Sequence, residues 1–255
     1  DTEQTVIELL EFTRKLDITV IVGAPVAVGA LLLNCALVIQ QGKLLGIVAK
    51  TFLPNYSEFY EKRWFASSQD LRPTEVVIAD QKLLISAKPK LFSTASGVLF
   101  GIEICEDVWA PIPPSNRLTL SGADIIFNLS ASDELIGKHT YLKSLLSQQS
   151  ARTICGYIYS GSGFGESTQD LVFGGNALIY ENGRLIASGK RFSLEGQMVT
   201  TQIDVEMLRS ERRDNTTYIN AQRSSELGIE QIDIITCFER DTNVFELERA
   251  IDPHP

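Results

Sequence analysis

The sequence predicts one mixed α/β domain in which helices cover layered β-sheets, and three observations lead to this prediction. Its 255 residues are enough to bury a sizeable core. Apolar residues make up 44% and charged residues 22%, which is ordinary globular composition and argues against disorder or a coiled coil. Short β-branched runs outnumber helical stretches and alternate with them, without an internal repeat, which is typical of sheets with covering helices.

The first part of the chain begins with a helical pattern and continues as strands. Apolar residues recur at helical spacing over about residues 3–16 and predict an amphipathic helix. A β-branched run over residues 18–22, ending at Gly23, predicts a buried strand. Two hairpins follow: residues 35–39 with 44–48 across Gln41-Gly42, and residues 76–79 with 82–86 across Asp80-Gln81. Residues 98–104 predict a strand that leads directly into Cys105.

The second part alternates helices and strands after a proline-rich break at residues 111–114. In order, we expect a short helix ending within 118–123, a strand over 125–129, a helix over 138–152, a strand over 154–159 and a glycine-rich loop over 161–165. Asn182-Gly183 is a strong turn signal between strands at 177–180 and 185–188, and residues 198–203 predict one more strand. After Asp204 the sequence is polar through residue 228, and residues 229–237 predict a last strand.

Charge and cysteine content exclude several classes of protein. Asp and Glu number 32 against 23 Lys and Arg, so the net charge of −9 argues against binding nucleic acid or an anionic membrane. The four cysteines have no regular spacing, which excludes a disulfide framework and indicates a reducing compartment. We therefore expect a cytoplasmic protein. The two histidines are too far apart in the sequence to build a zinc site with these cysteines, so no metal is predicted.

Cys105 is the first candidate for chemistry, because it ends an apolar strand and two acids follow it. A free cysteine is most often a buried core residue, and Cys35, Cys155 and Cys237 fit that interpretation inside apolar strands. The alternative for Cys105 is a nucleophile at a strand end, which needs a neighbour that promotes the thiolate. Histidine is scarce, so a lysine with a carboxylate is the alternative activating pair. Lys50 closes a predicted strand and precedes an aromatic and acidic loop, where it could be solvated or line a cleft.

Four segments in order resemble the nitrilase superfamily of carbon-nitrogen hydrolases, most closely the N-terminal glutaminase domains of glutamine-dependent NAD synthetases. They are Lys50-Thr-Phe-Leu-Pro-Asn-Tyr56-Ser-Glu-Phe-Tyr-Glu61, Gly101-Ile-Glu-Ile-Cys105-Glu106-Asp-Val-Trp109, Asn128-Leu-Ser-Ala-Ser132 and Gly165-Glu-Ser-Thr-Gln-Asp170-Leu-Val-Phe-Gly-Gly175. The terminal Asp-Pro-His-Pro is similar to that subgroup as well. The resemblance covers roughly residues 3–205, with weaker support in the tail, and its strength lies in four motifs at fitting spacing.

The resemblance implies a fold, a reaction and a set of site residues. The fold is an α-β-β-α sandwich that forms four layers, and the reaction is glutamine amide hydrolysis through a γ-glutamyl thioester. Cys105 matches the nucleophile, Lys50 the lysine of the Glu–Lys–Cys triad, and Glu61 a further acid of the pocket. Four residues match positions that bind glutamine in the family: Tyr56, Glu106, Ser132 and Lys138. At the position of Lys138, some relatives have Arg. An arginine would offer two parallel donors, whereas Lys138 keeps only the charge.

The match departs from the family at the start of the chain. The triad glutamate lies upstream of the lysine in the family, after a strand and a helix, and none of the acids before Lys50 sits in a matching motif. Glu8 and Glu11 fit the polar face of the first helix. We therefore expect that the chain, which begins at Asp1, lacks the first strand and helix of the sandwich together with the triad acid, and that it has been cut from a longer protein.

Three hypotheses for function stay open on the sequence. The first is a glutaminase domain over residues 1–255, with a core at about 3–205 and a tail at 206–255 that leads to a synthetase domain in the same longer chain. ATP, magnesium and deamido-NAD would belong to that synthetase domain, and this domain would need no cofactor. The second is a stand-alone amidase or carbamoylase of nitrilase type, and the third is a non-catalytic scaffold without the triad acid. The resemblance also implies a homo-oligomer.

Overall fold

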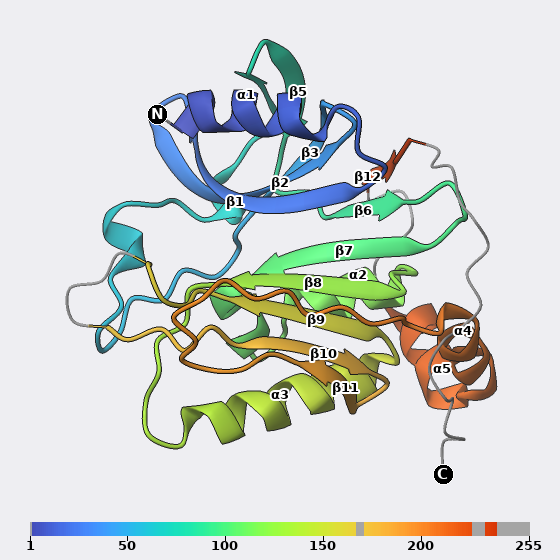
Figure 1. The fold of residues 1–255 in the computed structure, drawn as a ribbon. Helices are drawn as coiled ribbons and strands as arrows, with labels where there is room; N and C mark the ends of the chain where they lie inside the picture. Colours follow the sequence, from blue (N-terminus) through green and yellow to red (C-terminus); the bar gives the residue numbers. More distant parts are fainter. Residues whose placement is uncertain (1, 167–170, 226–232, 239–255) are drawn as a thin grey trace.

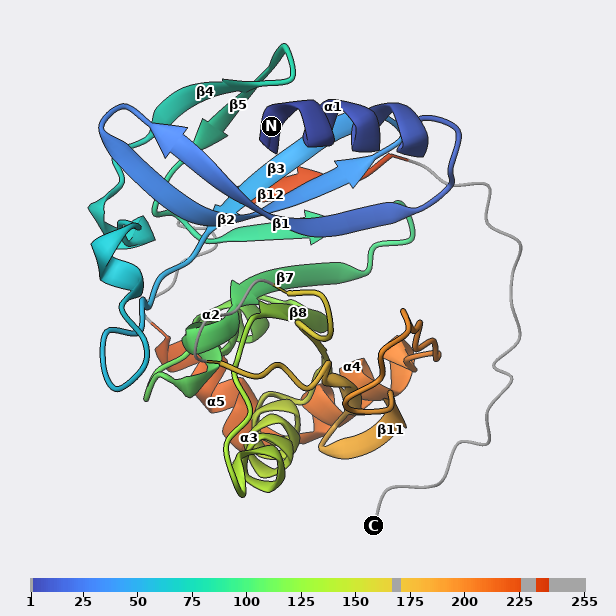
Figure 2. The same ribbon diagram turned by 60° about the vertical axis from the view of Figure 1, so that its left-hand side comes forward.

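Two β-sheets packed face to face form the centre of the molecule, with helices on both outer faces (Figure 1). The computed structural model describes residues 2–166, 171–225 and 233–238. One sheet has three strands and the other has seven. Helix α1 (Thr2–Thr13) covers the small sheet, while α2 (Pro114–Leu120) and α3 (Lys138–Thr153) cover the large one (Figures 1 and 2). The predicted α-β-β-α sandwich is confirmed for these residues.

The small sheet is a meander of long antiparallel strands. Its strands are β1 (Thr19–Val28), β2 (Leu31–Gln40) and β3 (Lys43–Ala49). The strand predicted over 18–22 is longer than expected and runs through Gly23 and Pro25, which an edge strand tolerates because no second neighbour needs the missing N–H. It turns into β2 at Gly29, whose φ of 59° requires the left-handed region.

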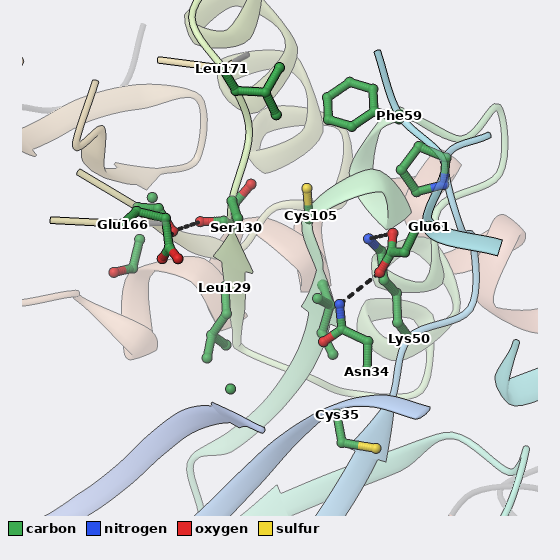
Figure 3. A pocket seen from close by; sticks show the side chains of 17 residues that line it. Asn34, Cys35, Lys50, Phe59, Glu61, Cys105, Leu129, Ser130, Glu166 and Leu171 are labelled. Atoms are coloured by element: carbon green, nitrogen blue, oxygen red, sulfur yellow. Dashed lines mark hydrogen bonds and ion pairs between the residues drawn. The ribbon is translucent and has the colours of Figure 1, made fainter. Parts of the chain in front are cut away.

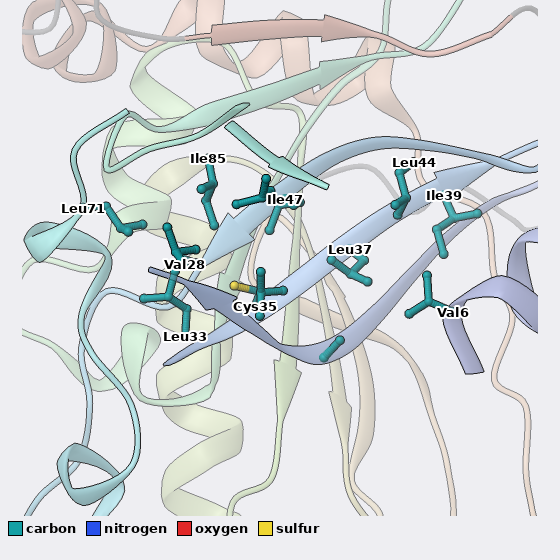
Figure 4. Close-up of a cluster of buried hydrophobic side chains, with 14 of the residues drawn as sticks. Val6, Val28, Leu33, Cys35, Leu37, Ile39, Leu44, Ile47, Leu71 and Ile85 are labelled. Carbon is teal, nitrogen blue, oxygen red and sulfur yellow. The ribbon is translucent and has the colours of Figure 1, made fainter. Parts of the chain in front are cut away.

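Both faces of β2 are buried, so its apolar residues alternate between two cores. Leu33, Cys35, Leu37 and Ile39 face α1 and the small hairpin β4 (Thr74–Ile78) and β5 (Gln81–Ile85), as Figure 4 shows. Ala36 and Val38 face the other sheet. Burial on two sides explains why this strand is a continuous apolar run in the sequence.

The large sheet combines a parallel centre with antiparallel edges. Its strands, in spatial order, are β11 (Arg184–Ser188), β10 (Ala177–Glu181), β9 (Gly156–Gly161), β8 (Ile125–Ser130), β7 (Leu99–Ile104), β6 (Lys90–Ser93) and β12 (Asp233–Thr236). β7, β8 and β9 are parallel, and α2 and α3 are the connections between them. The carboxyl ends of β7 and β8 therefore lie side by side, which brings Cys105 next to the loop after Ser130.

One expectation about elements is wrong, and two helices and one strand were not predicted. Residues 198–203 form no strand. Met198 is 87% exposed, so the run does not bury its apolar residues as a strand in a sheet would. Just before it, a side chain and not a backbone N–H makes the contact with the chain: Gln197 Nε2 donates to Lys190 O at 2.6 Å. The polar stretch after Asp204 forms two helices, α4 (Val205–Asp214) and α5 (Thr216–Ser224). Strand β6 was not predicted at all.

Several expectations lie outside the described residues. They concern residues 167–170 of the fourth motif, residues 229–232 of the last predicted strand, and the terminal Asp-Pro-His-Pro. The upstream strand, helix and glutamate concern sequence ahead of Asp1 and stay predictions. Within the three described ranges, no helix has the length and apolar character needed to cross a lipid bilayer.

Candidate active site

Cys105 stands at the carboxyl end of β7, where the chain turns sharply into the short 3₁₀ helix η3 (Cys105–Trp109). Its φ of 48° lies in the left-handed region, which is costly for a residue with a Cβ and is held by the surrounding structure. The residue is 8% exposed, and its sulfur points into a cavity (Figure 3). A strained turn at a strand end thus presents a thiol to bound molecules.

Asp107 joins the backbone before this turn to a second segment of the chain. Its Oδ2 accepts the N–H of Ile104 at 2.9 Å, and its Oδ1 accepts those of Thr51 at 3.1 Å and Phe52 at 2.7 Å. The carboxyl is 2% exposed, and burial raises its pKa to about 7 although the backbone hydrogen bonds lower it. One side chain therefore ties the nucleophile turn to the segment that follows Lys50.

Asn128, one strand away on β8, holds the peptide of Cys105 itself. Its Oδ1 accepts the Cys105 N–H at 3.1 Å, and its Nδ2 donates to the Tyr157 hydroxyl at 3.2 Å. The Tyr157 hydroxyl in turn donates to Glu103, and burial raises the pKa of that carboxyl. The N–H of Cys105 already has a hydrogen-bond acceptor in Asn128.

Lys50 follows the end of β3 and is buried against Glu61. Its Nζ lies 2.5 Å from Glu61 Oε2, and its side chain is 3% exposed. Asn34 Nδ2 donates to the other oxygen, Glu61 Oε1, at 2.7 Å. Lys50 and Glu61 thus form an ion pair, and Asn34 fixes the orientation of the carboxylate.

These side chains share a cavity of about 550 Å³, shown in Figure 3. Lys50, Glu61 and Phe59 line one side, and Ser130 and Glu166 line the other, with Cys105 between them (Figure 3). The volume falls in the range of small-molecule sites. No group of three or more His, Cys, Asp or Glu side chains suited to a metal ion occurs among the residues that the structure describes.

The four residues predicted to bind glutamine are not among those that line this cavity, although Tyr56 and Lys138 contact Phe59 at its edge. The Tyr56 hydroxyl donates to Glu106 Oε1 at 2.8 Å. Lys138 forms an ion pair with Asp133, and its Nζ lies 5.5 Å from the centre of the Phe59 ring. Burial raises the pKa of Glu106, while the Tyr56 hydrogen bond and the charges of Lys50 and Lys138 lower it. Ser132 is half-buried near the Tyr159 hydroxyl.

The structure adds three residues that the sequence reasoning missed. Asn34 holds Glu61, Asp107 holds the turn that carries the nucleophile, and Asn128 holds the Cys105 peptide. A signal was available for two of them, because Asn34 and Asn128 are amides inside otherwise apolar strands, where a polar side chain needs a partner. The interpretation of Cys35, Cys155 and Cys237 as core residues is confirmed, since all three are buried.

Comparison with curated proteins finds relatives over most of the chain. No family model matches. The glutamine-dependent NAD(+) synthetase of Mycobacterium leprae is 35% identical over 223 residues, which cover 87% of this chain and 32% of the relative. That of Aquifex aeolicus is 31% identical over 199 residues, covering 78% of this chain and 31% of the relative. The chain spans about a third of the length of these curated relatives.

Comparison with solved structures agrees on the fold. A glutamine-dependent NAD(+) synthetase from Cytophaga hutchinsonii superposes with a TM-score of 0.66 at 27% identity, covering 78% of this chain and 32% of that one. A member of the nitrilase superfamily from Saccharomyces cerevisiae gives a TM-score of 0.62 at 15% identity, covering 83% of this chain and 69% of that one, and shows the fold alone. The chain therefore has the nitrilase-superfamily fold and is homologous to about one third of the length of glutamine-dependent NAD(+) synthetases.

Proposed function

We propose that this chain hydrolyses the side-chain amide of glutamine with Cys105 as the nucleophile. The observation that supports this best is the convergence of Cys105 and the Lys50–Glu61 pair on one cavity, in a homologue of glutamine-dependent NAD(+) synthetases. Carbon–nitrogen bond hydrolysis by a thiol needs a nucleophile and a cation near the carbonyl oxygen, and the cavity offers both.

The reaction begins when the Cys105 sulfur attacks the amide carbon. Negative charge then develops on the carbonyl oxygen, where the Lys50 ammonium and the Glu106 N–H can stabilise it; one such donor contributes about 3–4 kcal/mol in a dry site. The carbon–nitrogen bond breaks, the amide nitrogen leaves as ammonia after taking up a proton, and a γ-glutamyl thioester remains on Cys105. Water then attacks the thioester, releases glutamate and restores the thiol.

Glu61 acts in this scheme as the residue that positions Lys50. Its two oxygens already accept from Lys50 and Asn34, so it is poorly placed to take the thiol proton. We assign the proton transfers to the upstream glutamate that the family resemblance implies. A form of the protein without this acid would be a non-catalytic scaffold, as the third hypothesis states.

Free glutamine carries an α-ammonium and an α-carboxylate, which need opposite charges in the site. Glu106 and Lys138 supply one of each, and they lie close enough together that the charge of Lys138 lowers the pKa of Glu106. Tyr56 orients Glu106 through its hydrogen bond, and Ser132 adds a hydroxyl. We therefore propose that these four residues bind the amino-acid end of the substrate.

The ammonia would be used by a synthetase domain in a longer form of the protein. Support comes from the relatives, of which this chain spans about a third. We propose that the synthetase domain consumes ATP and deamido-NAD with magnesium, and that the glutaminase domain described above needs no cofactor of its own.

The test is glutamate release from glutamine by the 255-residue chain and by the protein extended upstream of Asp1, each compared with its Cys105→Ala variant. We expect release from the extended protein, its loss in Cys105→Ala, and a much lower rate from the 255-residue chain. Release that survives Cys105→Ala would contradict the assigned nucleophile, and full-rate release by the 255-residue chain would contradict the need for an upstream acid. Faster hydrolysis of N-carbamoyl amides or nitriles than of glutamine would favour the amidase hypothesis instead.

A further inference from the structure

Lys90, the first residue of β6, is a buried cation that the proposed glutamine chemistry does not use. Its side chain is 6% exposed, and buried lysines are rare unless they are paired. Its register partner on β12 is Asp233, but Asp233 Oδ1 is bound to Lys88 at 2.6 Å. In the described part of the chain, the Lys90 ammonium makes no hydrogen bond or salt bridge of its own. Burial lowers the pKa of Lys90, and the nearby charge of Asp233 offsets this only in part.

A second cavity, of about 70 Å³, lies against this lysine. Its polar lining consists mainly of Lys88, Lys90, Arg117, Thr51, Ser68 and Ser86. One water takes up about 30 Å³, so the cavity has room for one small ion. It shares no lining residue with the cavity that holds Cys105.

The lining has the chemistry of an anion site. Three basic side chains, Lys88, Lys90 and Arg117, and one acid, Asp107, line the cavity. Lys88 is already paired with Asp233, and the oxygens of Asp107 already accept three backbone N–H groups. The Ser86 hydroxyl accepts the Lys88 N–H at 3.3 Å, so its own proton can be donated into the cavity. Lys88 is 38% exposed, which places one side of the cavity at the surface.

We propose that this cavity binds one small oxyanion between Lys90 and Arg117. Arginine and lysine with serine hydroxyls are the donors that phosphate and carboxylate groups prefer, and an anion would compensate the buried charge of Lys90. Thr51 lines this cavity while its neighbour Lys50 lines the catalytic one, so the anion would sit directly behind the turn that carries the catalytic lysine.

The test is thermal unfolding of the 255-residue chain in phosphate, sulfate, acetate or chloride at equal ionic strength. We expect a saturable rise in Tm of about 2–4 °C with at least one oxyanion and none with chloride. The Lys90→Met variant should lose this rise. Lys82→Met, which removes an exposed lysine, and Arg213→Gln, which changes a basic surface groove on α4, should keep it. The ranking of phosphate, sulfate and acetate identifies the preferred oxyanion.

Two outcomes would overturn the site: no saturable rise in the unmodified chain, or an equal rise in Lys90→Met. If Lys90→Met does not fold, Ser86→Ala takes its place, with an expected loss of about fivefold in oxyanion affinity for one hydrogen bond; an unchanged affinity then contradicts the proposal. Cys105→Ala should keep the full rise, so failure of the anion site and failure of the glutaminase proposal are separable.

Discussion

Lys50 and Glu61 form a charge pair that is largely shielded from water, at 3% and 15% side-chain exposure. Such a pair contributes little net stability compared with apolar residues, yet removing one partner leaves a buried charge without compensation. The pair therefore serves the orientation of the Lys50 ammonium more than the stability of the fold.

We expect Glu61→Gln to lower the free energy of unfolding by about 3 kcal/mol, because the Lys50 charge stays buried without its counter-ion. Urea denaturation measures this. The matched control is Glu75→Gln, which removes the exposed partner of Lys82 and should cost at most about 1 kcal/mol. The double variant Lys50→Met/Glu61→Gln should lose less stability than the sum of its single variants, and strict additivity would contradict a coupled pair.

Asp107 makes a pH-dependent contribution to stability. Burial raises its pKa from the ordinary range to about 7 in the folded protein, so the folded state binds a proton more tightly than the unfolded chain. The contribution is fully present below the unfolded pKa of about 4 and is lost as pH rises through about 7. The stability difference between the unmodified chain and Asp107→Asn should thus shrink between pH 4 and 8, as measured by urea unfolding across this range. A difference that grows with pH would show that the hydrogen bonds, and not burial, control this carboxyl.

At the scale of elements, α4 and α5 show how a polar sequence can still form docked helices. Leu208 and Tyr218 are their main apolar anchors. The rest of the attachment is polar: Arg212 donates to the carbonyls of Ile154 at 2.9 Å and Ala123 at 2.7 Å, and Arg209 binds Asp124 at 2.7 Å. Apolar residues are few in this stretch and arginines make much of the contact, so its polar composition concealed the two helices.

The start of α4 depends on its N-cap. Asp204 Oδ1 accepts the Met207 N–H at 2.9 Å, so Asp204→Ala should reduce stability by about 1 kcal/mol. Thermal unfolding with circular dichroism measures this loss. Asp214→Ala is the control at the other end of the same helix, where an acid opposes the helix dipole and its removal should be neutral or slightly stabilising. Equal losses at both ends would argue against capping as the cause.

At the scale of the whole molecule, the two sheets approach closely at Gly46 of β3. A Cβ added there would meet Ile235 Cδ1 at 2.8 Å and Phe92 Cε1 at 2.9 Å on the large sheet. The inter-sheet core is filled around this point, so the sheets leave no room for a side chain.

Gly46→Ala should therefore destabilise the protein by about 1–3 kcal/mol through overpacking. Gly196→Ala is the matched control, because nothing lies within 4 Å of its added Cβ, and its effect should be small. Chemical denaturation of the two variants gives the comparison. A Gly46→Ala variant as stable as the control would mean that the sheets can separate without cost.

Local sequence signals predicted most elements because these carry their own information. Apolar periodicity marks α1 and helical composition marks α3, while the pairs Gln41-Gly42 and Asn182-Gly183 mark two hairpins with left-handed turn residues. Strand β6 was missed because it spans only four residues, Lys90–Ser93, and begins with a lysine. The roles expected for Cys105, Lys50 and Glu61 came from the family resemblance of the motifs that contain them, and motif order along the chain does not show contact.

The sequence by itself determined the layered α/β class, the buried cysteines and the candidate nucleophile with its lysine, since each depends on composition or on a local motif. The tertiary structure alone decided what holds them in place. Asn34, Asp107 and Asn128 meet their partners from other segments of the chain, and the partner of a buried polar group depends on how strands pack, not on its neighbours in sequence. The same holds for Lys90, an ordinary surface residue by sequence, which only the packing of the two sheets turns into a buried charge beside a cavity.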